Sequence, residues 1–222
     1  MTLFAKTSPT TEPVVRPAPD RYRGVPLTVG GAILFAALLV SPGPDIARVH
    51  DALWGPAHAL HVVGLVLILL GFPAAFASLG RRLDTTTAVL AAIGYVALMT
   101  RCALSTGSHL YSMWILPQLA DHPELHTATR AGSGGLASIY AGHGDLIGAV
   151  IGVGFVALAV ALWRSGRTLR TVGGLAVLIG IGEILTNPIA LLLLAVVAVW
   201  LGLRLVVRDD VLIPLRSPAT TR

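Results

Sequence analysis

The chain has 222 residues, of which 55% are hydrophobic and only 12% are charged, and it contains one cysteine. A soluble domain carries about 25% charged residues, so this composition predicts a protein that crosses a membrane several times. The net charge of +5 comes from scattered basic residues, which argues against nucleic-acid binding, and a single cysteine excludes an intramolecular disulfide.

Six apolar segments follow one another between two polar tails. Residues 1–24 are rich in proline and lack the pattern of a cleaved leader, so we expect a disordered cytoplasmic tail. We predict membrane spans at about 25–40, 56–79, 86–106, 139–163, 169–185 and 189–207. Together they form one all-α transmembrane domain over 25–207, and a second cytoplasmic tail follows at 208–222.

The last two spans are separated by Thr186-Asn187-Pro188, because one helix over 169–207 would be roughly 60 Å long. Thirteen of the sixteen basic residues then fall on the side of the two tails. The positive-inside rule therefore predicts a six-helix bundle in the cell membrane with both termini in the cytoplasm. All seven histidines fall on the outer side of this arrangement.

Several polar residues lie on faces of the predicted spans that otherwise carry small side chains. These residues are His58 and His61 on the second span, Arg101 on the third with His109 continuing its line just beyond it, Asp145 on the fourth and Glu183 on the fifth. Small residues let membrane helices approach closely, so we expect these faces to point into the bundle. The result is a predicted outer-leaflet pocket, rimmed by Asp51, Trp54 and Tyr140.

Three kinds of chemistry fit such a pocket. Catalytic zinc or another divalent metal takes three protein ligands, which His58, His61 and His109, or two of them with Asp145 or Glu183, would supply. Asp145 or Glu183, with Arg101 beside them, could act as a general acid if the apolar surroundings keep the carboxyl protonated. Haem between His61 and His109 is a third alternative, which is less favoured because the inner half offers no histidine.

A structural explanation stands beside each of these. Arg101 can pair with Asp145 or Glu183 and simply join two helices, and histidines near a membrane surface can be solvated. The four tryptophans, Trp54 among them, lie near predicted interfaces, which is typical of an aromatic belt. We expect a short helix over about 122–130 to cover the pocket as a lid.

Three segments carry a resemblance to known proteins. They are His61-x2-Gly64 opening an apolar run, Arg81-Arg82 after it, and Gly173-Gly174-Leu175-Ala176 opening the fifth span. In these the chain resembles small actinobacterial membrane proteins with five or six spans and no assigned function. Its size and span count are also similar to those of bacterial membrane-integral terpene cyclases, whose acidic residues protonate a prenyl chain. No diagnostic motif of the cyclases is matched, so no residue is assigned from them.

We therefore expect a membrane-embedded enzyme that acts on a lipophilic small molecule by acid–base or metal-assisted chemistry. The most concrete reaction that we expect is isoprenoid (terpene) cyclisation. A metal-dependent modification of lipids is the second reaction that we consider. Two alternatives stay open. One is a non-catalytic carrier, immunity protein or partner subunit with a structural polar cluster, and the other is a single-haem redox protein.

Overall fold

The computed structural model describes residues 24–42, 48–80, 83–122, 145–165, 167–184 and 189–207. Over these ranges the chain forms helices and no strand, so the all-α prediction is confirmed there. The helices are α1 (Val25–Val40), α2 (Trp54–Gly80), α3 (Thr85–Trp114), α4 (Leu116–Asp121), α6 (Asp145–Ser165), α7 (Arg167–Ile184) and α8 (Ile189–Val207).

Four of the described helices are long and apolar enough to cross a membrane. Their apolar stretches are Trp54–Pro73, Thr85–Asp121, Ile147–Ser165 and Ile189–Val206. Two shorter apolar helices are Val25–Val40 and Arg170–Gly182. Large hydrophobic side chains such as Leu39 (70% exposed) and Leu70 (65% exposed) lie on the outside, where a bilayer would cover them. The chain is therefore a helical membrane protein, with a helix at each of the six predicted positions.

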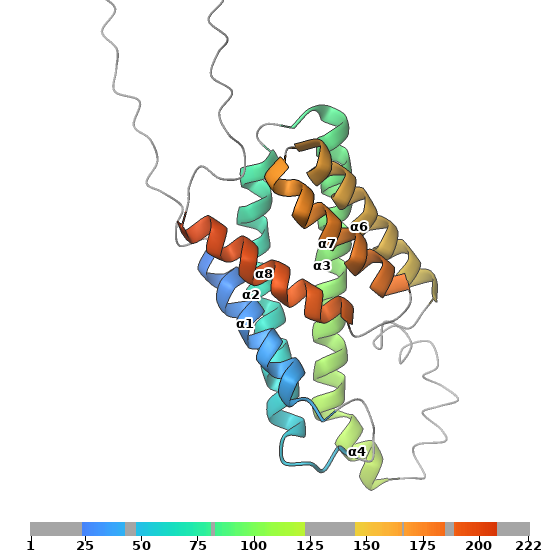
Figure 1. Cartoon of the computed structure of the whole chain (residues 1–222). Coiled ribbons are helices and arrows are strands. Elements are labelled where there is room, and N and C mark those ends of the chain that lie inside the picture. Colours follow the sequence, from blue (N-terminus) through green and yellow to red (C-terminus); the bar gives the residue numbers. More distant parts are fainter. Residues whose placement is uncertain are drawn as a thin grey trace, which may run out of the picture.

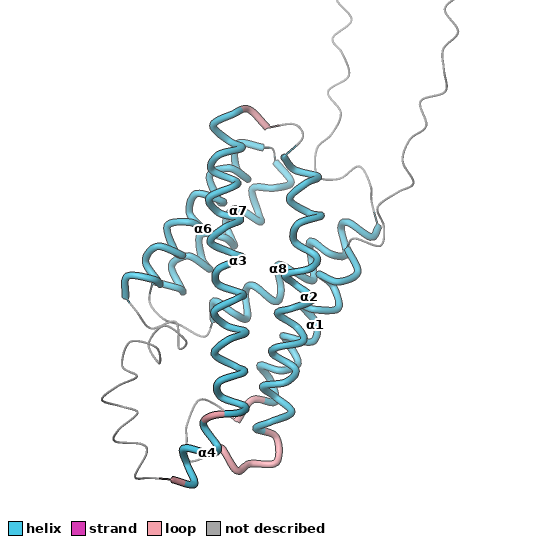
Figure 2. Tube along the Cα trace, turned by 180° about the vertical axis from the view of Figure 1, so that it is seen from behind, coloured by secondary structure: helices cyan, strands magenta, loops and turns pink. Residues whose placement is uncertain are grey.

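The six long helices pack in a closed ring. Each of them contacts the next one along the chain, and α8 returns to pack against α1. In Figure 1, α8 crosses in front of α1 and α2, α7 crosses in front of α3, and α6 lies to the right of α3. Figure 2 shows from behind that α3 lies between α2 and α6, so α3 joins the two halves of the ring.

One buried stripe runs along most of α2. Its members follow one another at alternating intervals of three and four residues, the spacing of a helix-packing seam. They are His58, His61, Leu65, Ile68, Phe72 and Ala75, and none is more than 6% exposed. We call this set the α2 stripe. It carries histidines at its beginning and apolar side chains at its end.

Glycines allow two of the helix pairs to approach closely. A Cβ atom on Gly64 of α2 would lie 2.9 Å from the backbone oxygen of Gly30 in α1, and a Cβ atom on Gly180 of α7 would lie 2.9 Å from that of Gly152 in α6. The small-residue stripes predicted at Gly64, Gly152 and Gly180 therefore do lie against other helices, as expected for membrane packing.

We predict that Gly64→Ala lowers the unfolding free energy by about 1–3 kcal/mol, because the new methyl group meets backbone atoms of α1. Gly174→Ala is the matched control, since nothing lies within 4 Å of its added Cβ, and it should be neutral or stabilising by about 0.5–1 kcal/mol. Denaturant unfolding in detergent measures both. Equal effects of the two substitutions would contradict the close α1–α2 approach.

The third helix is longer than the sequence indicates. We expected the span to end at about Thr106 and a polar segment to follow, but α3 continues to Trp114 and α4 forms directly after it. Gly107 and Ser108 are weak helix formers, which is why the local sequence predicts an end there. The extension is stabilised by contacts with α2, described below. Of the lid predicted over about 122–130, only His122 is described, and it follows the end of α4. The rest of the lid and the start of the fourth span at 139–144 lie outside the described residues.

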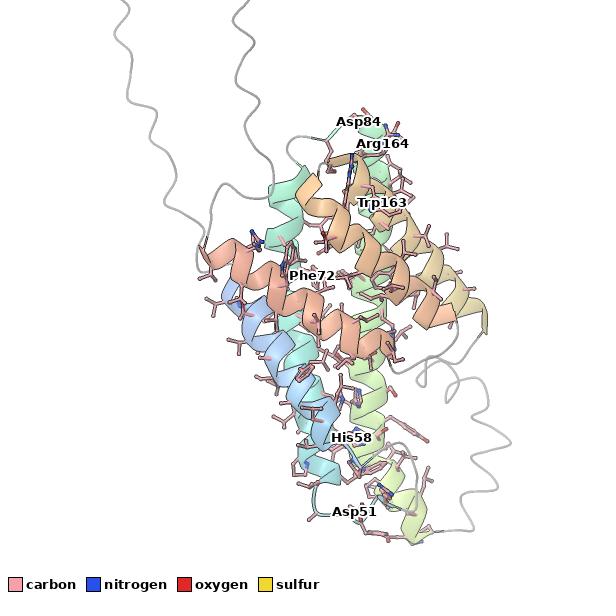
Figure 3. The ribbon with its side chains drawn as sticks, in the orientation of Figure 1. Asp51, His58, Phe72, Asp84, Trp163 and Arg164 are labelled. Atoms are coloured by element: carbon pink, nitrogen blue, oxygen red, sulfur yellow. The ribbon has the colours of Figure 1, made fainter. Side chains whose placement is uncertain are left out.

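Polar contacts among Asp84, Thr87 and Arg164 join the start of α3 to the end of α6, and we call this group the polar staple. Asp84 caps α3 by accepting hydrogen bonds from the amide of Thr87 at 3.0 Å and from its hydroxyl at 2.6 Å. Arg164 of α6 donates from Nε to the Thr87 hydroxyl at 3.0 Å and lies 3.7 Å from the Asp84 carboxylate. Figure 3 shows Asp84 and Arg164 together at the end opposite His58.

The Thr87 hydroxyl and then its amide, together with the Arg164 charge, hold the pKa of Asp84 below its ordinary value. A carboxylate with a lowered pKa stabilises the fold at neutral pH, and this contribution is lost as the pH falls through the lowered pKa. We predict that Asp84→Ala lowers the midpoint of thermal unfolding at pH 7, whereas Asp84→Asn, which retains a capping oxygen, lowers it less.

In acid, the difference between the wild type and Asp84→Asn should shrink, because the wild-type carboxylate becomes protonated. Thermal unfolding over a pH series measures this difference. An unfolding midpoint that is unchanged in Asp84→Ala would show that the staple contributes nothing.

Candidate metal centre

Three histidines meet where α2 begins and α3 ends. His58 and His61 are one turn apart in the first turns of α2, and His109 lies in the part of α3 that extends beyond the predicted span. Because α2 and α3 run in opposite directions and pack together, their ends bring these side chains to one place. Figure 3 shows His58 near the end of the molecule that also carries Asp51.

The three imidazole rings are in mutual contact. Nδ1 of His58 lies 2.9 Å from Nδ1 of His109, so one of the two nitrogens donates a hydrogen bond to the other. The rings of His61 and His109 are stacked with centroids 4.1 Å apart. One nitrogen from each of the three residues can be chosen so that all lie within 4.8 Å of one another.

The cluster is buried, and one of its nitrogens has no partner. His58 is 6% exposed and His61 is 2% exposed, while His109 is partly buried. Nε2 of His58 is fully buried and makes no hydrogen bond. Buried polar atoms are nearly always bonded, and an unsatisfied one calls for an explanation such as a bound ion or water.

His61 is held in one tautomer by its own helix. Its Nδ1 lies 2.8 Å from the carbonyl oxygen of Ala57. A carbonyl only accepts, so Nδ1 carries the proton and Nε2 keeps its lone pair for a ligand. This arrangement, a backbone carbonyl that orients the imidazole through its other nitrogen, is the usual support of histidines that ligate metals.

The donor set fits a divalent transition metal. Nitrogen ligands at about 2.0–2.1 Å in a tetrahedral zinc site lie about 3.3 Å from one another. One nitrogen from each histidine can be chosen so that the three lie at most 4.8 Å apart, which is within small side-chain movements of that value. Three neutral imidazoles would hold such an ion and leave a fourth position for another ligand.

Haem fits the same histidines poorly. The planes of His61 and His109 are inclined by only 21°, and the rings lie over one another. Stacked rings direct their lone pairs side by side, whereas two axial ligands must direct theirs toward each other across the iron. A macrocycle also needs more space between the rings than a stacked pair provides. The geometry therefore favours a single ion over haem.

Trp54 closes one side of the cluster. Its ring meets His58 edge-on with centroids 4.5 Å apart, and its Nε1 donates to the carbonyl of Ser112 at 3.0 Å. Trp54 is only 2% exposed, so the aromatic-belt interpretation is wrong for this residue and its assignment to the pocket is favoured. Trp114 (63% exposed) and Trp163 (51% exposed) have the exposure that a belt requires.

The other predicted residues are placed as follows. Arg101 is partly buried, and its guanidinium donates to the Ser105 hydroxyl one turn along α3. Asp51 is exposed at the end of the molecule, where its carbonyl accepts from the amide of Trp54 at 2.9 Å. Tyr140 and the side chains of Asp145 and Glu183 lie outside the described residues. The structure therefore brings together the predicted histidines of two spans.

Two contributions were missed by the sequence analysis. The carbonyl of Ala57 could have been found, because it lies four residues before His61, where a helical side chain can reach back. The carbonyl of Ser112 could not, because its bond to Trp54 depends on the α2–α3 packing. His50, which we did not assign to the pocket, lies apart from it, exposed and 3.5 Å from Asp121 of α4.

Comparisons with protein-family models, with curated proteins and with solved structures find no match for this chain. Its function is therefore argued from the site alone.

We predict that the purified protein binds one zinc or cobalt ion per chain. His58→Ala, His61→Ala and His109→Ala should each weaken binding by at least about tenfold, because each removes one of three ligands. Elemental analysis after dialysis and the visible absorption of bound cobalt measure this. His122→Ala is the control, since His122 is exposed. Unchanged stoichiometry in all three cluster variants would exclude the site.

Proposed function

We propose that the chain is a metal-dependent membrane enzyme that acts on a lipophilic substrate at the histidine cluster. The observation that carries the proposal is the cluster itself. His58, His61 and His109 are close enough to share one ion, and the unpartnered Nε2 of His58 is buried beside them. Ionisable residues that are buried in a membrane protein are costly, and their usual explanation is a functional site.

The proposal includes six crossings, with both termini in the cytoplasm and the cluster in the outer leaflet. Support comes from the four helices of spanning length, the two shorter apolar helices, and the ring that all six form. The arginine-bearing staple and the histidines also lie at opposite ends of the bundle, as a positive-inside arrangement requires. A cell membrane with this orientation is the localisation that we propose.

The side chains divide the work at the site. His58, His61 and His109 hold the ion, the Ala57 carbonyl fixes the tautomer of His61, and Trp54 separates His58 from water. When bound, a divalent ion polarises a carbonyl or phosphoryl oxygen of the substrate. The low dielectric around the buried rings strengthens this interaction relative to water.

Isoprenoid cyclisation is a narrower form of the same proposal. It depends on Asp145 or Glu183 as the acid, with Arg101 nearby, and none of the described contacts favours it over other lipid chemistry. Product analysis with Asp145→Asn and Glu183→Gln tests it.

The experiment for the general proposal compares lipids. Zinc-loaded protein is reconstituted in vesicles made from a total lipid extract of the producing cells, and the lipids are profiled by mass spectrometry. We expect a lipid that is consumed by the wild type and by His122→Ala, but not by His109→Ala or after chelation of the metal. The reason is that the first two keep the three ligands and the last two do not.

An unchanged lipid profile with a stoichiometric metal would overturn the enzyme proposal. It would favour the non-catalytic alternative, in which the cluster holds an ion for a carrier or for a structural role.

A further inference from the structure

An apolar cavity lies inside the ring, away from the histidines. It measures about 40 Å³ and is partly enclosed by side chains from α2, α3, α6, α7 and α8, all of them apolar. Phe72, Phe76 and Phe155 form its aromatic part. A water molecule needs about 10–15 Å³ and two to four polar partners, so the cavity has room for about three groups of that size but no partners for water.

The apolar side chains around the cavity favour a hydrocarbon group as its occupant. Side chains around a gap lose the dispersion contacts that a filling group would restore. Of its lining residues, Phe72 lies at the end of the apolar stretch of α2 and Leu98 lies within that of α3, so a hydrocarbon chain that enters the cavity exchanges one apolar environment for another with closer contacts. A hydrocarbon chain therefore fills the cavity without the cost of burying a polar group.

The cavity and the histidine cluster lie on the same faces of the same two helices. On α2, Phe72 follows His61 by eleven residues, and on α3, Leu98 precedes His109 by eleven residues. Eleven residues are about three helical turns, which is roughly 16 Å along either helix. Figure 3 shows Phe72 and His58 at different heights of the bundle, as this offset requires.

This offset matches the depth of one leaflet. The hydrocarbon core of a bilayer is about 30 Å thick, so a lipid chain extends over about 15 Å from its head to the midplane. A lipid whose head binds at the histidines would therefore have the end of its chain at the level of the cavity.

We propose that the cavity holds the end of the hydrocarbon chain of a substrate whose polar head binds at the histidine cluster. The inference rests on the proposed function and names its substrate class: an amphiphile with an acyl or prenyl chain about as long as one leaflet is deep. The path of the chain follows α3, where the intervening buried residues Cys102 and Ser105 are small, whereas Leu65 and Ile68 fill the α2 stripe.

The test uses a photoreactive probe. A long-chain fatty acid with a diazirine on its terminal carbon, and a short-chain analogue, are added to the zinc-loaded full chain in lipid nanodiscs. After illumination, peptide mass spectrometry locates the label. We expect the long probe to label cavity residues such as Phe155 and Leu194 severalfold more than the lipid-facing Val153 and Leu178. The short probe should not reach the cavity.

Two variants sharpen the test. Ala176→Leu adds bulk to the cavity wall and should reduce labelling there severalfold, with the zinc content unchanged. Ala92→Leu, on the exposed side of α3, is the matched control and should leave the labelling as in the wild type. His109→Ala should lose the preference for the cavity, because the head is no longer held.

The outcomes separate the two proposals. Label that falls only on lipid-facing residues while zinc is bound would overturn this inference and leave the metal centre standing. Cavity labelling that persists in His109→Ala would overturn the link between head and chain. Absence of zinc from the wild type would overturn the proposed function itself.

Discussion

The burial of two histidines at the start of the α2 stripe is the constraint on which the rest of the structure depends. Polar groups removed from water in a membrane protein must find partners within the protein. His61 finds the carbonyl of Ala57, and His58 finds His109. The second contact requires α3 to continue as a helix beyond Thr106, where the sequence predicts its end. The length of α3 and the depth of the cluster thus have one physical cause.

The polar side chains at the two ends of the bundle differ in whether all of them have hydrogen-bond partners. At one end, the exposed side chains of Asp84 and Arg164 both bond to the buried hydroxyl of Thr87, so each of these three side chains has a partner. At the other end, neutral rings are buried together and Nε2 of His58 is left without one. A network whose polar groups are all bonded is sufficiently explained by stability, whereas a buried group without a partner points to a ligand. This difference is the reason for assigning function to the histidine end.

Much of the architecture follows from local properties of the chain. Hydropathy and the break at Thr186-Asn187-Pro188 predict the six long helices but not α4, and the one-turn spacing of His58 and His61 predicts their common face. Glycine spacing predicts close helix contacts, which occur at Gly64 and Gly180. The role of Trp54 was harder to predict, because a tryptophan near a membrane interface can belong to an exposed aromatic belt or can be buried beside the pocket. Its environment depends on whether α3 reaches that far.

By itself, the sequence determined that the protein is an all-helical membrane protein and that His58 and His61 share a helix face. Both facts depend on residues close together in the chain, where composition and helical period decide the outcome. Only the tertiary structure decided that His109, 51 residues after His58, joins them, and that the cavity lies three turns away. The reason is that the relative register of two antiparallel helices is set by packing along their whole length, which no local pattern encodes.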